Sequence, residues 1–102
     1  MKEIPKEHAL EQNYPNPFNP STNIGFRIAE FGLVRLKVYN VLGQEVATLV
    51  NEEMQPGSYE VTWSAKGGSA SGGDAYNLPS GVYFYTLQAG AFHATKKLVL
   101  LR

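Results

Sequence analysis

Residues 34–39 read Val-Arg-Leu-Lys-Val-Tyr, and this alternation of apolar and polar side chains decides the fold class. Successive side chains of a β-strand point to opposite faces of a sheet, so the stretch predicts a strand with one buried face. Similar stretches recur along the chain, separated by Gly, Pro and Asn. The six expected strands cover residues 24–29, 34–39, 46–50, 58–63, 81–87 and 92–101. A seventh is expected within one of the longer loops.

The short connections between these stretches favour antiparallel pairing, because parallel strands need crossovers of a dozen or more residues. No long stretch shows apolar residues at helical spacing. Several short strands joined by turns predict an all-β sandwich or barrel. Trp63 sits in the middle of one strand pattern and is expected in the core, where its indole N–H would need a hydrogen-bond partner.

The composition excludes several classes of protein. The chain has 102 residues, enough for one domain, and 43% of them are hydrophobic. Nine Lys and Arg balance nine Asp and Glu, which argues against a strongly basic nucleic-acid binder. The absence of cysteine excludes a disulfide framework, a zinc–thiolate site and a cysteine nucleophile. No apolar run is long enough for a membrane helix.

The side chains that carry chemistry are scattered. His8 and His93 share no metal-binding spacing, and no serine stands in a Gly-x-Ser-x-Gly motif. Glu52 and Glu53 are adjacent in an expected turn and are interpreted as solvated. Asp74, in a glycine-rich stretch at residues 66–74, lacks the alternating oxygen ligands of a calcium loop. We therefore expect no enzyme activity, no cofactor and no metal.

Two stretches depart from the strand pattern. The glycine- and serine-rich stretch at residues 66–74 has the composition of a flexible linker, natural or engineered. Residues 10–22 contain three prolines and cannot join a central strand. We expect this second stretch to run extended along the surface, with Tyr14 and Phe18 as the side chains that dock onto a sheet.

The strand at residues 81–87 is apolar on both faces. Its aromatic side chains Tyr83, Phe84 and Tyr85 could form a stacking platform for sugars or bases. The simpler interpretation is a strand covered on both faces, by the opposite sheet and by the proline-rich stretch.

The end of the chain combines cations with an apolar run. Lys96, Lys97 and Arg102 flank residues 98–101. One interpretation is a last strand whose solvated cations discourage edge pairing. The other is a terminal strand that a partner recognises, by strand addition at its edge. The two lysines are adjacent, so they point to opposite faces and at least one must reach solvent.

Four stretches together resemble a known family. They are residues 10–22, 38–46, 79–85 and 94–102. In this order they resemble the type IX secretion system C-terminal sorting domains, type A, which end large exported proteins of Bacteroidetes. The immunoglobulin-like domain of flagellar hook-capping proteins is a related family.

The resemblance implies an immunoglobulin-like antiparallel β-sandwich of about seven strands at residues 10–102, preceded by a flexible tail or linker at residues 1–9. It also implies a non-catalytic signal that directs an attached N-terminal cargo, absent from this chain, through the periplasm and across the outer membrane. Surface anchoring or release would follow. The implied partners are the type IX translocon and outer-membrane shuttle or sortase proteins, without nucleic acid and without membrane insertion. Self-association through an edge strand is a further expectation.

Motif by motif, the resemblance also implies the residues of partner recognition. They are Pro15, Asn16, Pro17, Phe18, Gly81, Val82, Tyr83, Lys96, Lys97, Leu98, Val99 and Arg102. Two alternatives stay open: a passive spacer domain of a larger extracellular protein, and a carbohydrate-binding or adhesion module. The second requires exposed aromatic side chains, so burial of Tyr83 and Tyr85 would exclude it.

Overall fold

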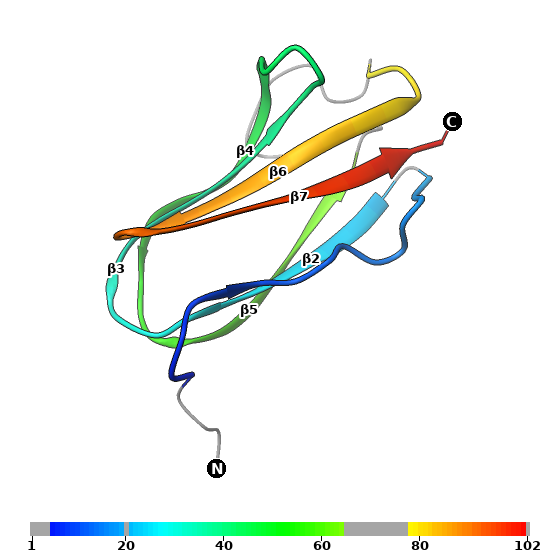
Figure 1. Ribbon diagram of the computed structural model, residues 1–102. Coiled ribbons are helices and arrows are strands. Elements are labelled where there is room, and N and C mark those ends of the chain that lie inside the picture. Colours follow the sequence, from blue (N-terminus) through cyan, green and yellow to red (C-terminus); the bar gives the residue numbers. More distant parts are fainter. Residues whose placement is uncertain (1–4, 20, 65–77, 102) are drawn as a thin grey trace.

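The computed structural model describes residues 5–19, 21–64 and 78–101, and all regular structure in these ranges is β-strand. Seven strands follow one another along the chain (Figure 1). They are β1 Ala9–Leu10, β2 Ser21–Ile28, β3 Gly32–Tyr39, β4 Glu45–Met54, β5 Gly57–Ser64, β6 Gly81–Ala89 and β7 Phe92–Leu100. Within the described ranges, no helix is long and apolar enough to cross a membrane.

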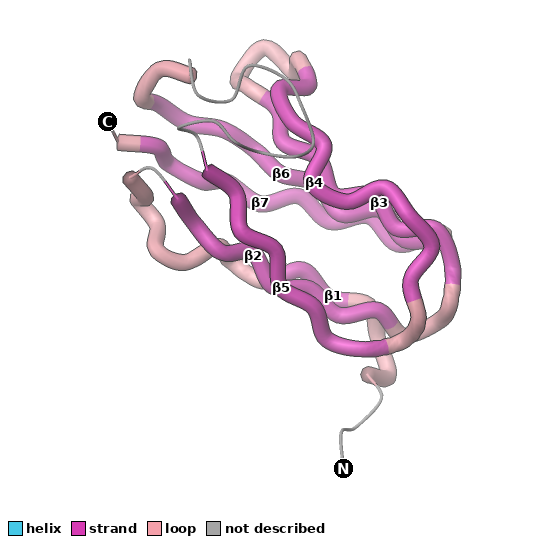
Figure 2. The backbone as a smooth tube through the Cα atoms, turned by 180° about the vertical axis from the view of Figure 1, so that it is seen from behind, coloured by secondary structure: helices cyan, strands magenta, loops and turns pink. Residues whose placement is uncertain are grey.

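The strands form two sheets that face each other (Figure 2). One sheet has the order β1-β2-β5 and the other the order β4-β3-β6-β7. All neighbouring strands are antiparallel, as predicted, and short turns join the paired strands β3 and β4 and the paired strands β6 and β7. The arrangement confirms the predicted all-β sandwich of about seven strands.

The core lies between the sheets and contains the apolar side chains that the alternation assigns to one face of each strand. In β3, the apolar side chains at positions 34, 36 and 38 are fully buried. Trp63 of β5 is also fully buried, and its ring lies 5.6 Å from that of Phe18 and 6.3 Å from that of Tyr83. Trp63 is therefore a core residue as predicted, but its Nε1–H has no hydrogen-bond partner among the described residues.

The seventh strand, β1, lies before the proline-rich stretch and not within a later loop. Its two residues, Ala9 and Leu10, pair with Arg27 and Phe26 of β2. Two residues are too few to show an alternation, so this strand has no periodic signal in the sequence. The glycine-rich stretch at residues 66–74 lies outside the described residues.

The strand β4 is longer than its apolar run at residues 46–50. Glu52 and Glu53, expected in a turn, lie instead in β4 opposite Val34 and Leu33 of β3. Both glutamates are exposed, near the end of β4, which is an edge strand of its sheet. Their interpretation as solvated carboxylates therefore stands, although their predicted place in a turn was wrong.

Candidate functional site

Three stretches that are far apart in the sequence meet at one end of the sandwich (Figure 1). They are residues 12–18, which we call the opening segment, residues 81–83 at the start of β6, and residues 96–101 at the end of β7. Leu100 connects them, because it pairs with Gly81 on one side and forms a parallel bridge with Phe18 on the other. We call this meeting place of the three stretches the motif end.

The backbone of Phe18 extends the larger sheet beyond β7. Its amide donates a hydrogen bond to the carbonyl of Val99, and its carbonyl accepts one from the amide of Leu101, both at 2.9 Å. The Phe18 side chain is buried against Trp63. Phe18 thus docks as predicted, whereas the Tyr14 side chain is 78% exposed.

Two side-chain amides continue the closure of the β7 edge. The amide of Val99 donates to Oδ1 of Asn16 at 2.9 Å, and Nε2 of Gln12 donates to the carbonyl of Lys97 at 2.7 Å. These side chains occupy backbone groups that a neighbouring strand would otherwise bind. Strand addition by a partner was predicted for an open edge, but from Lys97 to Leu101 the edge is already occupied.

The hydroxyl of Tyr85 in β6 anchors the other end of the opening segment. It donates to the carbonyl of Glu11 at 2.7 Å and accepts from the amide of Asn13 at 2.8 Å. The buried Asn13 side chain in turn donates to Oγ1 of Thr22 in β2 at 2.9 Å. Burial raises the pKa of Tyr85 to about 12, although the hydrogen bond from Asn13 acts in the opposite direction. The opening segment is therefore held to both sheets.

Lys96 and Lys97 point to opposite faces of β7. Lys96 shares the inner face with the buried Leu98 and is half-buried. Lys97 shares the outer face with Val99 and is exposed, next to Phe84 on the paired strand. Neither lysine forms an ion pair within the described part of the chain. Of these two lysines, Lys97 is thus the exposed cation of the motif end.

The other predicted recognition residues divide by exposure. Exposed are Pro15, Asn16, Pro17 and Val82, half-buried are Gly81 and Val99, and buried are Phe18, Tyr83 and Leu98. Gly81 has a φ of +150°, which L side chains rarely adopt, and an added Cβ would meet nothing within 4 Å. Backbone conformation, and not close packing, therefore favours glycine there. Arg102 lies outside the described residues.

No pattern in the sequence indicates the polar side chains that hold the opening segment. Gln12 and Asn13 stand in the proline-rich stretch, but their partners lie much later in the chain. Tyr85 was interpreted either as part of an aromatic platform or as part of a strand covered on both faces, and neither interpretation assigned a role to its hydroxyl, which holds the opening segment. An amide next to a proline-rich stretch is a weak signal for such a role, because nothing local identifies its partner.

The aromatic residues of β6 do not form a stacking platform. Tyr83 is 4% exposed and Tyr85 is 0% exposed, so both are buried. On the opposite face of β6, Phe84 is half-buried and Val82 is exposed. The opening segment lies along the edge of β7, so it does not cover this face, contrary to the expectation. A carbohydrate-binding function based on these tyrosines is therefore excluded.

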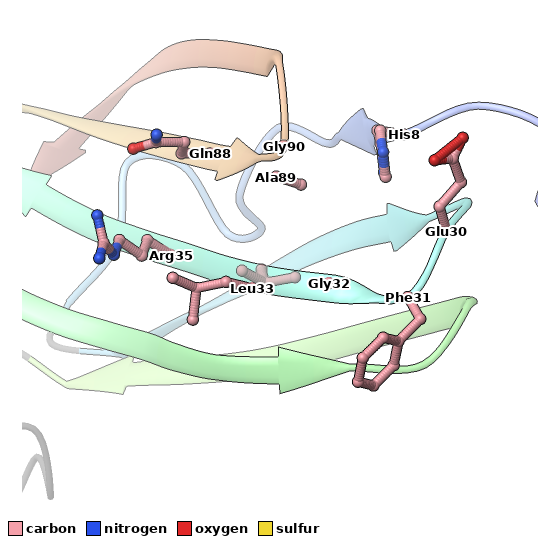
Figure 3. Close-up of a pocket in the computed structure, with 10 residues that line it drawn as sticks. His8, Glu30, Phe31, Gly32, Leu33, Arg35, Gln88, Ala89 and Gly90 are labelled. Carbon is pink, nitrogen blue, oxygen red and sulfur yellow. The ribbon is translucent and has the colours of Figure 1, made fainter.

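A separate hollow lies at the opposite end of the sandwich, beside the β2–β3 and β6–β7 turns (Figure 3). His8 and Glu30 stand at one end of the hollow, and Arg35 and Gln88 stand at the other. The imidazole of His8 accepts a hydrogen bond from the amide of Ala29 at 3.1 Å through Nδ1. In the described ranges, no three His, Asp or Glu side chains gather as a metal site would require.

Known proteins share sequence or structure with this chain. A protein-family model described as "Secretion system C-terminal sorting domain" matches residues 12–101. Among solved structures, the chain is similar to the crystal structure of dimeric latent PorU from Porphyromonas gingivalis, with a TM-score of 0.65 and 16% sequence identity. The match covers 97% of this chain and 10% of that one, so the chain spans about a tenth of its length. No curated protein matches.

Proposed function

The chain belongs to the family of secretion system C-terminal sorting domains, and we propose that its motif end is the surface that the export machinery recognises. Domains of this family are C-terminal sorting signals for type IX secretion, a system of Bacteroidetes, and this chain is such a signal. Sorting domains of this kind are generally non-catalytic. The cargo lies N-terminal to them, and export across the outer membrane delivers it to the cell surface or the medium.

The observation that carries the proposal is the three-way pairing of Phe18, Leu100 and Gly81. Through it, three of the four stretches that resemble the family's motifs meet at one place in the fold. Since Asn16 and the Phe18 backbone occupy the edge of β7, the partner binds the outer face of this surface. That face offers Lys97 as a cation, with Val82 and Val99 as apolar neighbours.

The finer course of export is part of the proposal. The folded domain is presented in the periplasm to the translocon or to an outer-membrane shuttle protein. After the cargo has crossed, a sortase removes the domain and anchors the cargo, or the cargo is released. Lys97 and its apolar neighbours act in recognition, and no step requires a catalytic group of this chain.

A transport assay tests the proposal. A leader peptide and a fluorescent reporter are placed ahead of the whole chain, and the fusion is expressed in a bacterium with a type IX system. Two altered fusions are compared with the intact fusion. One carries Lys97→Ala, which changes an exposed side chain, and the other ends at Ala94. Matched circular dichroism spectra and melting temperatures show whether the Lys97→Ala domain is folded.

Export of the intact fusion, with periplasmic retention of both altered fusions, would support the proposal. If the intact fusion folds but stays in the periplasm, the domain acts as a passive spacer in this setting. If the intact and Lys97→Ala fusions are exported equally well, Lys97 is not part of the recognition surface.

A further inference from the structure

The turn between β3 and β4, residues 40–44, is shaped by its polar residues and its glycine. Oδ1 of Asn40 accepts hydrogen bonds from the amides of Leu42 at 2.9 Å and Gln44 at 3.0 Å. The Asn40 carbonyl accepts from the amide of Gly43, whose φ is +82°. Nδ2 of Asn40 also donates to Oε1 of Gln44 at 2.8 Å. These contacts make a well-ordered Asx turn without any contribution from the side chains of residues 41 and 42.

Those two side chains are apolar and stand in solvent. Val41 is 68% exposed and Leu42 is 79% exposed, whereas turns usually carry polar residues at such positions. Together with residues 78–83 they line an open groove beside the start of β6. Val82, at 36% exposure, lies in this groove, so the groove joins the motif end directly. Grouped exposed apolar side chains on a small domain mark interaction surfaces.

We infer that this groove and turn form a docking site for an apolar side chain of a protein subunit of the export machinery, an inference that rests on the proposed function. The groove shares Gly81, Val82 and Tyr83 with the motif end, so a partner that binds one surface reaches the other. The described residues that line it carry no charged side chain, which fits an uncharged apolar partner group. Lys97 lies outside the groove and supplies the electrostatic part of the contact.

The rigid turn explains how so small a surface can bind. The hydrogen bonds of Asn40 fix the backbone of residues 40–44 before any partner arrives. A preorganised surface loses less conformational entropy on binding than a mobile one. Val41 and Leu42 therefore present a fixed apolar surface on one side of the groove, and Val82 lines the same groove from β6.

The test uses the reporter fusion of the whole chain with the double substitution Val41→Ser/Leu42→Ser. Both side chains are largely exposed, so the fold should survive. A conservative variant, Val41→Ile/Leu42→Met, keeps the surface apolar. Phe31→Ser serves as the matched control, because Phe31 is also an exposed apolar turn residue, 56% exposed, beside the hollow at the opposite end.

We expect export of the double serine variant to fall by about tenfold, as for the loss of an interface hot spot. The conservative variant and Phe31→Ser should export like the intact chain. Equal export of the double serine variant, with the intact chain exported, would overturn this inference and leave the proposed function in place. Absence of export by the intact chain would overturn the proposed function itself.

Sedimentation of the purified chain tests the other possible occupant of the groove, which is a second copy of the chain. If the intact chain is dimeric, the double serine variant is monomeric, and both are exported equally, the surface mediates self-association and the inference is wrong. A chain that is monomeric at the concentrations tested, combined with the tenfold loss of export, supports a partner of the export machinery.

Discussion

The substitution Tyr85→Phe removes a single oxygen atom that holds the opening segment to the sheet. This hydroxyl donates to the Glu11 carbonyl and accepts from the Asn13 amide. The aromatic ring, which is fully buried in the core, keeps its place in the variant. The change therefore tests the two hydrogen bonds and leaves the packing intact.

The expected cost follows from the two backbone groups that lose this hydroxyl as a partner. An unsatisfied buried polar group costs about 1–3 kcal/mol. Asn13 is buried, while Glu11 is exposed and its carbonyl can regain a bond to water. With one buried group left unsatisfied, we therefore expect the free energy of unfolding to fall by about 1–3 kcal/mol, or the melting temperature by roughly 4–24 °C.

Urea denaturation of the intact chain and the variant, followed by tryptophan fluorescence, measures this difference. Trp63 is the only tryptophan and is fully buried, so its emission reports unfolding of the core. Tyr59→Phe is the control, because its hydroxyl donates to the Gln55 carbonyl at an exposed site. Loss of that bond should cost less than about 1 kcal/mol.

A Tyr85→Phe variant whose stability lies within about 0.5 kcal/mol of the Tyr59→Phe control would refute this reasoning, given the 1–3 kcal/mol expected for each buried orphan group. The Tyr85 hydroxyl would then not be the group that holds the opening segment in place.

Three further perturbations test other parts of the structure. Phe18→Ala should lower the free energy of unfolding by about 3–5 kcal/mol, because it empties a buried site against Trp63; urea denaturation measures the loss, and a cost below about 1 kcal/mol would contradict the docking. The folded state raises the pKa of Tyr85 to about 12 from 10, so it holds that proton more tightly than the unfolded chain. Stability should therefore be full below pH 10 and fall as the pH rises toward 12, and this decline should disappear in Tyr85→Phe when denaturation is repeated across that range. Gly43→Ala should cost about 1–2 kcal/mol, since an alanine at a φ of +82° is strained while its Cβ meets no neighbour; unchanged stability would show that the turn relaxes freely.

Most of the strands could be predicted from the sequence, because each buries one face. The alternation at residues 34–39 and 58–63 identifies the strands β3 and β5 directly. The extension of β4 to Met54 could not be predicted, because residues 51–53 are polar and exposed. Their strand conformation comes from pairing with β3, which leaves no mark on the local sequence.

The residues of the motif end could be singled out from the sequence, but their assembly could not be predicted. The resemblance marked Phe18, Gly81 and Lys97, yet no local pattern indicates that Phe18 pairs beside Leu100. Gln12 and Asn16 bind backbone groups more than eighty residues away. Such contacts depend on the packing of the two sheets, which the sequence encodes only through the whole fold.

Amide hydrogen exchange at Val99 and Leu101 tests most directly whether the opening segment closes the terminal strand. Both amides point away from β6 and would be open to water on an ordinary edge strand. With their bonds to Asn16 and Phe18, we expect both to exchange slowly in the intact chain, and Asn16→Ala should speed exchange at Val99 more than at Leu101. Exchange of both amides at the rate of an unstructured peptide would contradict the closed edge and the recognition through the outer face that depends on it.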